Sequence, residues 1–367
     1  MFVQSSHRGA IADFAGLPNL DLLRAFAVSL VFLDHTLLYL VAGGDHLARW
    51  PLSPLAIGRF GVLLFFVHTC LVLLLSMSRG SQTGGLAAEA ARFYVRRVFR
   101  IYPLASAVIL LTLLAHVPAA PNETFLTAGW PAIVSNLLLI QNITHARDIV
   151  GPLWSLPYEV EMYLALPFLF CLTKGTRGLV WIGVVYAAVV AASLGGPSIG
   201  LRGAYLLEFV PCFFGGILAY VILRYDPVRR LPWWLWFTFV VLIGAIFVAV
   251  SPGTEQSHYF KEWIGCLLIG GSLPFAVQVA FRPLVFVANR IAEYSYSVYL
   301  LHLPAMWVVL LFAREWPLFA KVGLSLMLTA VFSAFAYHLI EKPIQQLGRR
   351  IAFARPAAQP RVLADVH

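Results

Sequence analysis

Charged residues are scarce in this chain of 367 residues. Asp, Glu, Lys and Arg make up 12% of it, whereas hydrophobic residues make up 60%. A soluble domain carries about 25% charged residues, so the composition excludes an ordinary soluble protein and predicts an integral membrane protein. The strands of a membrane barrel would alternate polar and apolar residues over about ten positions. The long runs of this sequence show no such alternation and are apolar on every side, which favours helices.

Long apolar runs, bounded by Gly, Pro or charged residues, recur along the whole chain. At about 20 residues for each span, they predict an all-α polytopic membrane protein, a bundle of about ten transmembrane helices. The expected spans are 20–42, 58–78, 101–118, 152–173, 178–194, 203–224, 232–250, 262–281, 291–312 and 319–341. A shorter run at 131–141 is too brief to cross the bilayer.

Cysteine is rare as well. The four cysteines all fall inside expected spans, with no CxxC pair and no metal-ligand spacing. We therefore expect small apolar core residues and no metal site. Residues 1–16 lack the apolar core of a signal peptide and are expected to form a cytoplasmic N-terminal segment. The transmembrane domain is expected at 17–347 and a basic cytoplasmic tail at 348–367.

The net charge of +9 comes from arginines that gather in alternate segments between the spans. If the N-terminus is cytoplasmic, the inside segments hold most of the Lys and Arg residues, for example around 79–100, 224–230 and 342–361. By the positive-inside rule, both termini of this multi-pass protein are expected in the cytoplasm. The same rule explains the basic charge without nucleic acid as a partner, and membrane lipid is the expected surrounding.

The first expected span carries three ionisable residues, Arg24, Asp34 and His35. Such groups at membrane depth are costly and usually face a polar cavity, so they are functional candidates. Arg24 and His35 stand at i and i+11, within roughly 20° of the same helix face and about 16 Å apart along the axis. This arrangement suits a long anionic ligand whose reactive end lies far from its phosphates. Asp34 points about 100° away from His35, so we do not expect it to orient the imidazole.

A second basic cluster precedes the expected 101–118 span. Arg97 and Arg100 stand at i and i+3, so on a helix they lie side by side and can present two planar guanidinium groups to phosphates. The alternative is a cytoplasmic flank that only sets the orientation of the protein. Arg24, near the same membrane surface, would supply a third donor.

Polar side chains also open the expected 152–173 span. Trp154, Ser155 and Glu159 could bind a sugar through ring stacking and hydrogen bonds, or they could form an aromatic belt with a helix cap. Glu159 and Glu161 cannot share a helix face, so at most one of them points into a cavity shared with His35.

The expected 291–312 span contains a polar stripe. Ser295, Tyr299 and His302 follow the 4-and-3 spacing of one helix face. These residues either belong to a functional site or only make hydrogen bonds that hold helices together. A single imidazole in the second span, His68, is interpreted as a packed residue.

Together these segments resemble the acyltransferase 3 family of membrane-bound O-acyltransferases. The matching motifs, in family order, are Arg24 with His35, Arg97 with Arg100, Trp154 to Glu159, Phe209 to Tyr220, Ser295 to Pro304, and Glu341 to Pro343. Residues 65–72 depart from the family's Phe-Phe-Val-Leu-Ser-Gly-Phe-Leu, and loss of the small Ser-Gly pair predicts altered packing of the second span. The sequence shows no GDS-type motif of the SGNH-hydrolase domain that some members carry, so a standalone member is expected.

The resemblance implies an enzyme of the bacterial inner membrane that moves an acyl group, commonly acetyl, from cytoplasmic acyl-coenzyme A to a hydroxyl of a carbohydrate or glycolipid. His35 would be the general base, and Glu159 would orient it or bind the acceptor. No tightly bound cofactor is expected, because acyl-coenzyme A is a donor substrate. Arg24, Arg97 and Arg100 would bind the donor's phosphates, and Trp154, Ser155, Tyr299 and His302 would bind substrate.

Two alternatives remain at this stage. A non-enzymatic transporter or flippase of a polysaccharide or lipid precursor would also need polar groups inside a helix bundle. It should show internal repeats or interrupted helices in matching halves, and the sequence contains no convincing repeat. Another class of membrane acyltransferase is disfavoured, because the HxxxxD pattern of the glycerol-phosphate type is absent.

Overall fold

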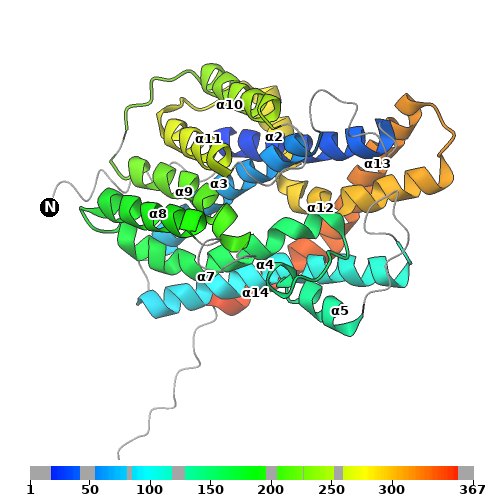
Figure 1. Cartoon of the computed structure of the whole chain (residues 1–367), viewed down its shortest axis with the longest axis horizontal. Coiled ribbons are helices and arrows are strands. Elements are labelled where there is room, and N and C mark those ends of the chain that lie inside the picture. The colour runs from blue at the N-terminus through cyan, green and yellow to red at the C-terminus, as the bar shows by residue number, and fades with distance from the viewer. Residues whose placement is uncertain are drawn as a thin grey trace, which may run out of the picture.

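The computed structural model describes residues 18–41, 54–80, 85–117, 129–195, 205–225, 227–251 and 259–353. In these ranges nearly every element is helical, and the sole strand-like pairing is an isolated bridge between Leu231 and Ala276. The helices form one bundle around α3, as Figure 1 shows. The expected all-α membrane architecture is therefore confirmed.

The helices follow the expected apolar runs in order. They are α2 (Pro18–His35), α3 (Pro54–Gly80), α4 (Leu86–Leu114), α5 (Trp130–Leu137), α6 (Gln141–Thr144), α7 (Leu156–Thr173), α8 (Gly178–Gly195), α9 (Tyr205–Leu223), α10 (Trp233–Ala249), α11 (Tyr259–Ser272), α12 (Arg282–Phe312), α13 (Leu318–Ala336) and α14 (Lys342–Phe353). Short π or 3-10 segments are η1 (Thr36–Val41), η3 (Gly151–Ser155), η5 (Leu273–Phe275) and η6 (Tyr337–Glu341).

The expected count of about ten transmembrane helices is not confirmed. Six helical segments of the described chain have the length and composition of a membrane span: Pro18–Val41, Leu55–Arg79, Ala87–Leu114, Gly178–Gly195, Arg282–Phe312 and Leu318–Phe353. Residues 208–223 and α10 form shorter apolar helices. The described part of α11 is shorter still, at 14 residues.

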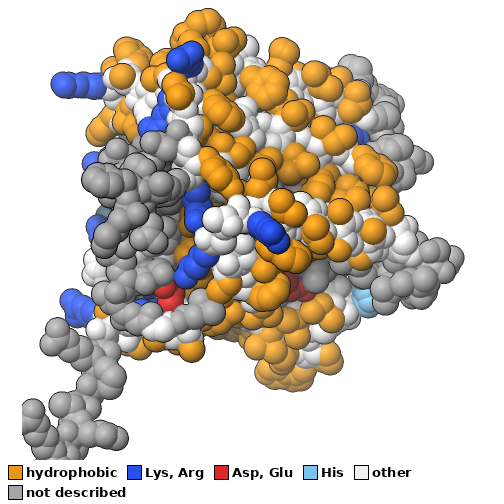
Figure 2. Space-filling model, turned by 90° about the vertical axis from the view of Figure 1, so that its left-hand side faces the viewer, with side chains coloured by type: hydrophobic (Ala, Val, Ile, Leu, Met, Phe, Trp, Pro, Cys, Tyr) orange, Lys and Arg blue, Asp and Glu red, His pale blue; other side chains and the backbone are white. Residues whose placement is uncertain are grey.

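Large apolar side chains cover much of the outer surface. Leu114, Trp130 and Phe319 are each about four-fifths exposed. Figure 2 shows broad hydrophobic areas on one face, with Lys and Arg side chains mostly in the left half and centre of the view. Apolar patches of this extent are rare on soluble monomers and are expected where lipid covers the protein. By contrast, 78% of the apolar window of α3 is buried, so α3 forms the centre of the bundle.

Glycines of α9 bring it very close to α3 and α11. A Cβ atom on Gly216 would lie 2.3 Å from the carbonyl oxygen of Val67, and one on Gly215 would lie 2.2 Å from that of Cys266. Small residues permit such close approach between helices in membranes. The packing of α3 thus depends on glycines of the neighbouring helix, next to the positions where α3 itself lacks the Ser-Gly pair.

Two π-helical segments lie beside titratable residues of the site. The π turn η1 begins directly after His35, and η6 ends at Glu341, which is buried. The segment η6 also precedes Pro343, which has no N–H to donate to a regular helix. A π turn shifts the side chains that follow it and is frequent at functional sites.

The basic ends of two helices are longer than expected. Helix α4 begins at Leu86, well before residue 101, so Arg97 and Arg100 lie within a regular helix. Helix α14 continues to Phe353, beyond the expected boundary at residue 347. We call the end of the bundle where α2 and α12 begin and α14 lies the basic end. All four cysteines are free thiols, and three of them are buried in the core.

Candidate active site

The polar stripes of α2 and α12 face each other. Arg24 Nε donates to Ser295 Oγ at 2.6 Å, and His35 Nδ1 lies 3.3 Å from His302 Nε2. Both contacts advance in the same direction along the two helices, so α2 and α12 run side by side in parallel. The expected polar face of α12 is therefore real, and its members contact the residues proposed for chemistry.

The hydrogen bonds of the two imidazoles define their tautomers. His302 Nδ1 lies 3.1 Å from the Val298 carbonyl oxygen, and His35 Nδ1 lies 2.9 Å from the Val31 carbonyl oxygen. A carbonyl oxygen only accepts, so in the neutral rings each Nδ1 carries the hydrogen. His302 Nε2 is then a second, longer acceptor of the same His35 Nδ1–H that Val31 accepts, and His35 Nε2 retains a lone pair for a substrate proton.

Glu159 is not the residue that contacts His35. Its carboxylate accepts a hydrogen bond from Tyr163 Oη one turn along α7. Among the described residues, the hydrogen-bonded side chain beside His35 is His302. The expectation that Glu159 orients the imidazole is therefore corrected, because α7 directs this carboxylate toward arginines instead.

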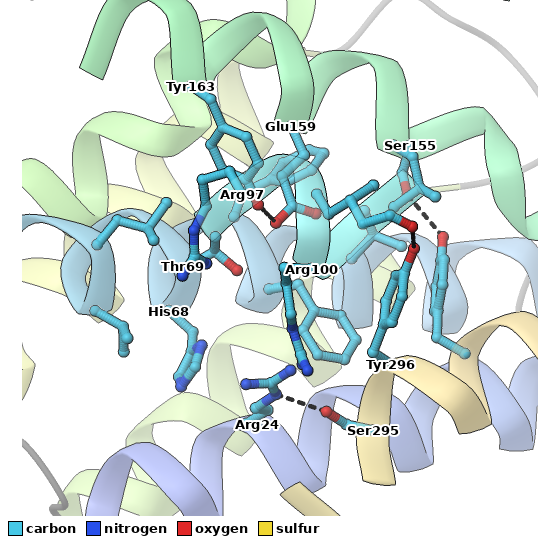
Figure 3. A pocket seen from close by; sticks show the side chains of 18 residues that line it. Arg24, His68, Thr69, Arg97, Arg100, Ser155, Glu159, Tyr163, Ser295 and Tyr296 are labelled. Atoms are coloured by element: carbon cyan, nitrogen blue, oxygen red, sulfur yellow. Dashed lines mark hydrogen bonds between the residues drawn. The ribbon is translucent and has the colours of Figure 1, made fainter. Parts of the chain in front are cut away.

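A narrow cavity with both apolar and polar walls lies between α2, α3, α4, α7 and α12 (Figure 3). It has a volume of about 90 Å³ and contains the three arginines expected to bind phosphate, Arg24, Arg97 and Arg100. We call it the arginine cavity. Its other polar lining residues are His68, Thr69, Ser155, Glu159, Tyr163, Ser295, Tyr296 and Tyr299.

Arg100 is held by a buried carboxylate at the end of η6. Its Nη1 donates to Glu341 Oε1, and Ser297 Oγ donates to the other carboxylate oxygen at 2.5 Å. Gln345 Nε2 donates to Glu341 Oε1 at 3.1 Å. The fully buried charge is thus paired and hydrogen-bonded, as burial requires. The bonds fix Arg100 across the cavity from Arg24, and Figure 3 shows the two guanidinium groups pointing toward one another.

Arg97 is less well satisfied. Its Nε is buried and has no hydrogen-bond partner among the described residues. Three guanidinium groups share this cavity with one lining carboxylate, Glu159, while Glu341 neutralises Arg100 from behind. Like charges gathered in a protein interior repel, so an anionic ligand would be stabilised here.

Ser155 and Tyr299 lie between the arginines and the imidazoles. The Ser155 hydroxyl is 2.7 Å from the Tyr299 hydroxyl, and both residues line the arginine cavity. The Tyr299 ring lies 6.3 Å from the His302 ring, which in turn lies 4.9 Å from the His35 ring. A continuous row of side chains therefore leads from the phosphate-binding arginines to the candidate base.

Trp154 faces a different cavity from its neighbour Ser155. This second cavity has a volume of about 310 Å³, and we call it the outer cavity. Trp154 and Tyr158 supply two aromatic rings there, with centroids 6.3 Å apart. The remaining lining residues are Gln141, Asn142, His145, Ala146 and Asp148. The 3-10 turn η3 thus separates the expected substrate group into two parts.

Two further titratable residues, His68 and Glu341, lie at the arginine cavity or pair with its arginines. The sequence predicts a packed His68, but this residue lines the arginine cavity, and its buried Nδ1 has no hydrogen-bond partner in the described part of the chain. Glu341 matches a motif in the sequence, and in the structure it pairs with Arg100. The available signal was chemical in both cases, because a charged or titratable residue inside a span needs a partner.

Asp34 has a structural role in the described protein. Its Oδ1 accepts a hydrogen bond from the backbone N–H of Gly58 at 2.9 Å. A Cβ atom on Gly58 would lie 2.8 Å from the Asp34 carboxyl group, so a glycine is required at this contact. The carboxylate is therefore occupied by the start of α3, and the expectation that it does not orient His35 agrees with this geometry.

Comparison with known proteins identifies the class. Residues 17–338 match the family model of the acyltransferase domain known as acyltransferase 3. The chain belongs to this family, and it is an integral membrane acyltransferase. No solved structure matches it.

Three named relatives cover more than nine-tenths of this chain. It is 26% identical to acyltransferase MdmB of Streptomyces mycarofaciens, over 93% of this chain and 94% of MdmB. It is 24% identical to nodulation protein 10 of Rhizobium leguminosarum bv. viciae, over 92% of this chain and 95% of that protein. It is 25% identical to O-acetyltransferase OatA of Staphylococcus aureus, over 92% of this chain but 58% of OatA.

Proposed function

We propose that the enzyme transfers an acyl group, most simply acetyl, from acyl-coenzyme A to a hydroxyl of a carbohydrate or glycolipid. One observation carries this proposal: a cavity with three arginines has Tyr299 in its wall, and the Tyr299 ring lies 6.3 Å from the His302 ring of a hydrogen-bonded imidazole pair. Arginine suits phosphate because its planar group forms two parallel hydrogen bonds. A donor with phosphates at one end and a thioester at the other matches this separation.

In the proposed reaction, His35 Nε2 accepts the proton of the acceptor hydroxyl. The hydroxyl oxygen attacks the thioester carbonyl carbon, an oxygen–carbon bond forms, and the carbon–sulfur bond breaks. The leaving thiolate takes a proton from the His35 imidazolium, which restores the neutral base. An imidazolium ordinarily loses its proton with a pKa of about 6.5, so the neutral imidazole is a suitable general base near neutral pH.

His302 acts on His35 and not on the substrate in this proposal. Its Nε2 and the Val31 carbonyl oxygen share the Nδ1–H of His35, so the lone pair of His35 is kept at Nε2. The Val298 carbonyl oxygen fixes the His302 ring in turn. His302 is therefore a positioning residue, and Glu159 and Tyr163 are assigned to the donor side of the site.

The outer cavity is the proposed acceptor site. Aromatic faces and carboxamide or carboxylate groups are a suitable lining for a sugar, because its C–H faces stack while its hydroxyls form hydrogen bonds. Trp154 and Tyr158 supply the rings, and Asn142 and Asp148 supply polar groups. We place the basic end in the cytoplasm of a bacterial plasma membrane, because the positive-inside rule favours it.

The test uses membrane vesicles from cells that produce the chain. Acetyl-coenzyme A with a radiolabelled acetyl group is supplied at the basic end, and label is then measured in the carbohydrate and glycolipid fractions, together with free thiol. We expect incorporation and thiol release with the wild type and neither with His35→Ala, at equal amounts of inserted protein. Equal labelling with both proteins would remove His35 from the mechanism. Thiol release without labelled carbohydrate would refute the proposed acceptor class.

A further inference from the structure

A third cavity lies at the basic end between α4 and α14. Its volume is about 270 Å³, and the described residues that line it include four arginines and no acidic residue. We call it the basic-end cavity. It is lined by Ser76, Arg96, Arg97, Arg100, Gln345, Arg349 and Phe353. Arg97 and Arg100 also line the arginine cavity, so the two cavities share a wall.

The charge of this cavity is only partly neutralised. Arg100 pairs with Glu341, whereas Arg97 forms a hydrogen bond with Tyr163 but its buried Nε has no partner among the described residues. No salt bridge of the described residues includes Arg349. Glu89 acts on Arg96 from two turns earlier in α4, but it does not line the cavity. Several like charges facing one space are stabilised when an anion binds between them.

Helix α14 is held firmly enough to form a binding wall. A Cβ atom on Gly348 would lie 2.4 Å from Phe99 Cβ, so the two helices are in close contact at this point. Arg349 follows Gly348 directly, and Phe353 lies one turn further. The Arg96 guanidinium carbon lies 5.6 Å from the centre of the Phe353 ring. An aromatic ring beside a guanidinium group forms a platform on which a nucleobase can stack.

We propose that the basic-end cavity binds the nucleotide end of the acyl donor, a 3′-phosphorylated adenosine diphosphate. The proposal rests on the function proposed above. Arg97 and Arg100, in the shared wall, hold the diphosphate, and the thin pantetheine arm enters the arginine cavity. Arg349 and Arg96 bind the 3′-phosphate, and Phe353 stacks on the adenine. Inorganic phosphate or a lipid headgroup would use the arginines but would leave the aromatic platform unused.

The experiment measures binding to the full chain in phosphatidylcholine nanodiscs. The ligands are coenzyme A, 3′-dephospho-coenzyme A, which lacks only the 3′-phosphate, and 4′-phosphopantetheine, which lacks the nucleotide. The wild type should bind coenzyme A about tenfold more tightly than the 3′-dephospho form, because a phosphate paired with arginine makes strong charge-assisted hydrogen bonds. Arg349→Ala should remove this preference by weakening coenzyme A alone.

Two further variants make the result specific. Arg350→Ala removes the same charge from α14 at an exposed position outside the cavity, and it should keep the tenfold preference. Phe353→Ala should weaken the binding of coenzyme A and of its 3′-dephospho form by a similar factor. The affinity for 4′-phosphopantetheine should not change. If Arg349→Ala and Arg350→Ala behave alike, the effect is only long-range charge and the proposed site is refuted.

The outcomes also separate this proposal from the function on which it rests. If the wild type binds coenzyme A tightly and Arg349→Ala binds it equally well, the nucleotide site is refuted, but acyl-coenzyme A remains the proposed donor. If the wild type binds none of the three ligands, both the proposed donor and the nucleotide site are refuted. A second arm adds phosphatidylglycerol to the nanodiscs. If Arg349→Ala lowers retention of that lipid but not of coenzyme A, the cavity binds a lipid phosphate and the nucleotide proposal is wrong.

Discussion

His302 lies within hydrogen-bond reach of His35, with 3.3 Å between Nε2 of the first ring and Nδ1 of the second. The two rings meet at 61°, edge to face, and the single Nδ1–H of His35 is shared between His302 Nε2 and the Val31 carbonyl oxygen, which is 2.9 Å away. His302 is only 1% exposed, and its ring is anchored to the backbone of its own helix. The pair thus gives the half-buried imidazole of His35 a fixed orientation and a defined tautomer.

Removing the His302 imidazole should lower the turnover number without weakening the binding of the donor. We expect His302→Leu to reduce kcat at least tenfold and to leave the KM for acetyl-coenzyme A nearly unchanged, because a positioned base contributes about 10² to 10⁴ in rate. His302→Gln should retain more activity, since its amide oxygen can also accept from His35 Nδ1. Steady-state kinetics of both variants provide the check. A normal kcat for His302→Leu would contradict the positioning role.

The sequence predicts the polar faces of this site better than their partners. The spacing of Arg24 with His35, and of Ser295 with Tyr299 and His302, follows from helix periodicity alone. Which side chain of α12 meets which side chain of α2 depends on how the helices pack, and no single-sequence pattern contains that information. The orienting role expected for Glu159 is corrected for this reason, because α7 places its carboxylate beside Tyr163 and the arginines.

The same limit applies to the fold. Apolar runs identify the helices, because every backbone group must be satisfied inside the bilayer. Their ends are less certain: the Ala-rich stretch before Arg92 extends α4 back to Leu86, and the π turn η6 carries the last helix on through Pro343. The count of about ten spans is not confirmed within the described residues, since an apolar run does not show how long a helix it forms.

Replacing the arginines proposed to bind phosphate with lysine should selectively weaken the binding of the donor. We expect Arg97→Lys and Arg100→Lys each to raise the KM for acetyl-coenzyme A about tenfold, because one ammonium cannot replace a two-pronged guanidinium group. Arg100→Lys should also lower stability, since Glu341 loses its matched partner inside the protein. Lys keeps the positive-inside signal, so topology should not change. Unchanged binding of coenzyme A in both variants would make these residues orientation signals only.

His68 offers a test of the donor channel on the α3 side. Its ring is 4% exposed and lines the arginine cavity, with Nδ1 available for a hydrogen bond. We expect His68→Ala to raise the KM for acetyl-coenzyme A several-fold, because the donor loses a hydrogen bond, typically about 1 kcal/mol. The smaller side chain should also let a longer acyl donor, such as butyryl-coenzyme A, compete better. Kinetics with both donors test this, and an unchanged ratio of kcat/KM values would show that His68 is only packed.

Asp148 should make stability depend on pH. It lies outside the candidate membrane spans, and burial raises its pKa to about 6, with Gln141 and Arg147 only partly opposing the effect. Folding therefore favours the protonated carboxyl, and this stabilisation is complete below pH 3.8 and lost as the pH rises through about 6. Asp148→Asn should accordingly raise the unfolding temperature in detergent more at pH 7 than at pH 4. An equal shift at both pH values would contradict the raised pKa.

The proposed orientation predicts which ends of the bundle a membrane-impermeant thiol reagent can reach. Ser155 is buried against Tyr299, so exposed positions make better probes. In a Cys-free background, Thr144→Cys lies in α6 beside the outer cavity, and Arg350→Cys lies on the exposed side of α14. In intact spheroplasts we expect labelling of the first cysteine alone, whereas the second should react only after the membrane is opened. Inside-out vesicles should give the opposite result, which controls for intrinsic reactivity.

If the cysteine in α14 reacts first in spheroplasts, the basic end faces outward. A cytoplasmic donor could then not reach Arg97 and Arg100, and the proposed transfer across the membrane would be wrong.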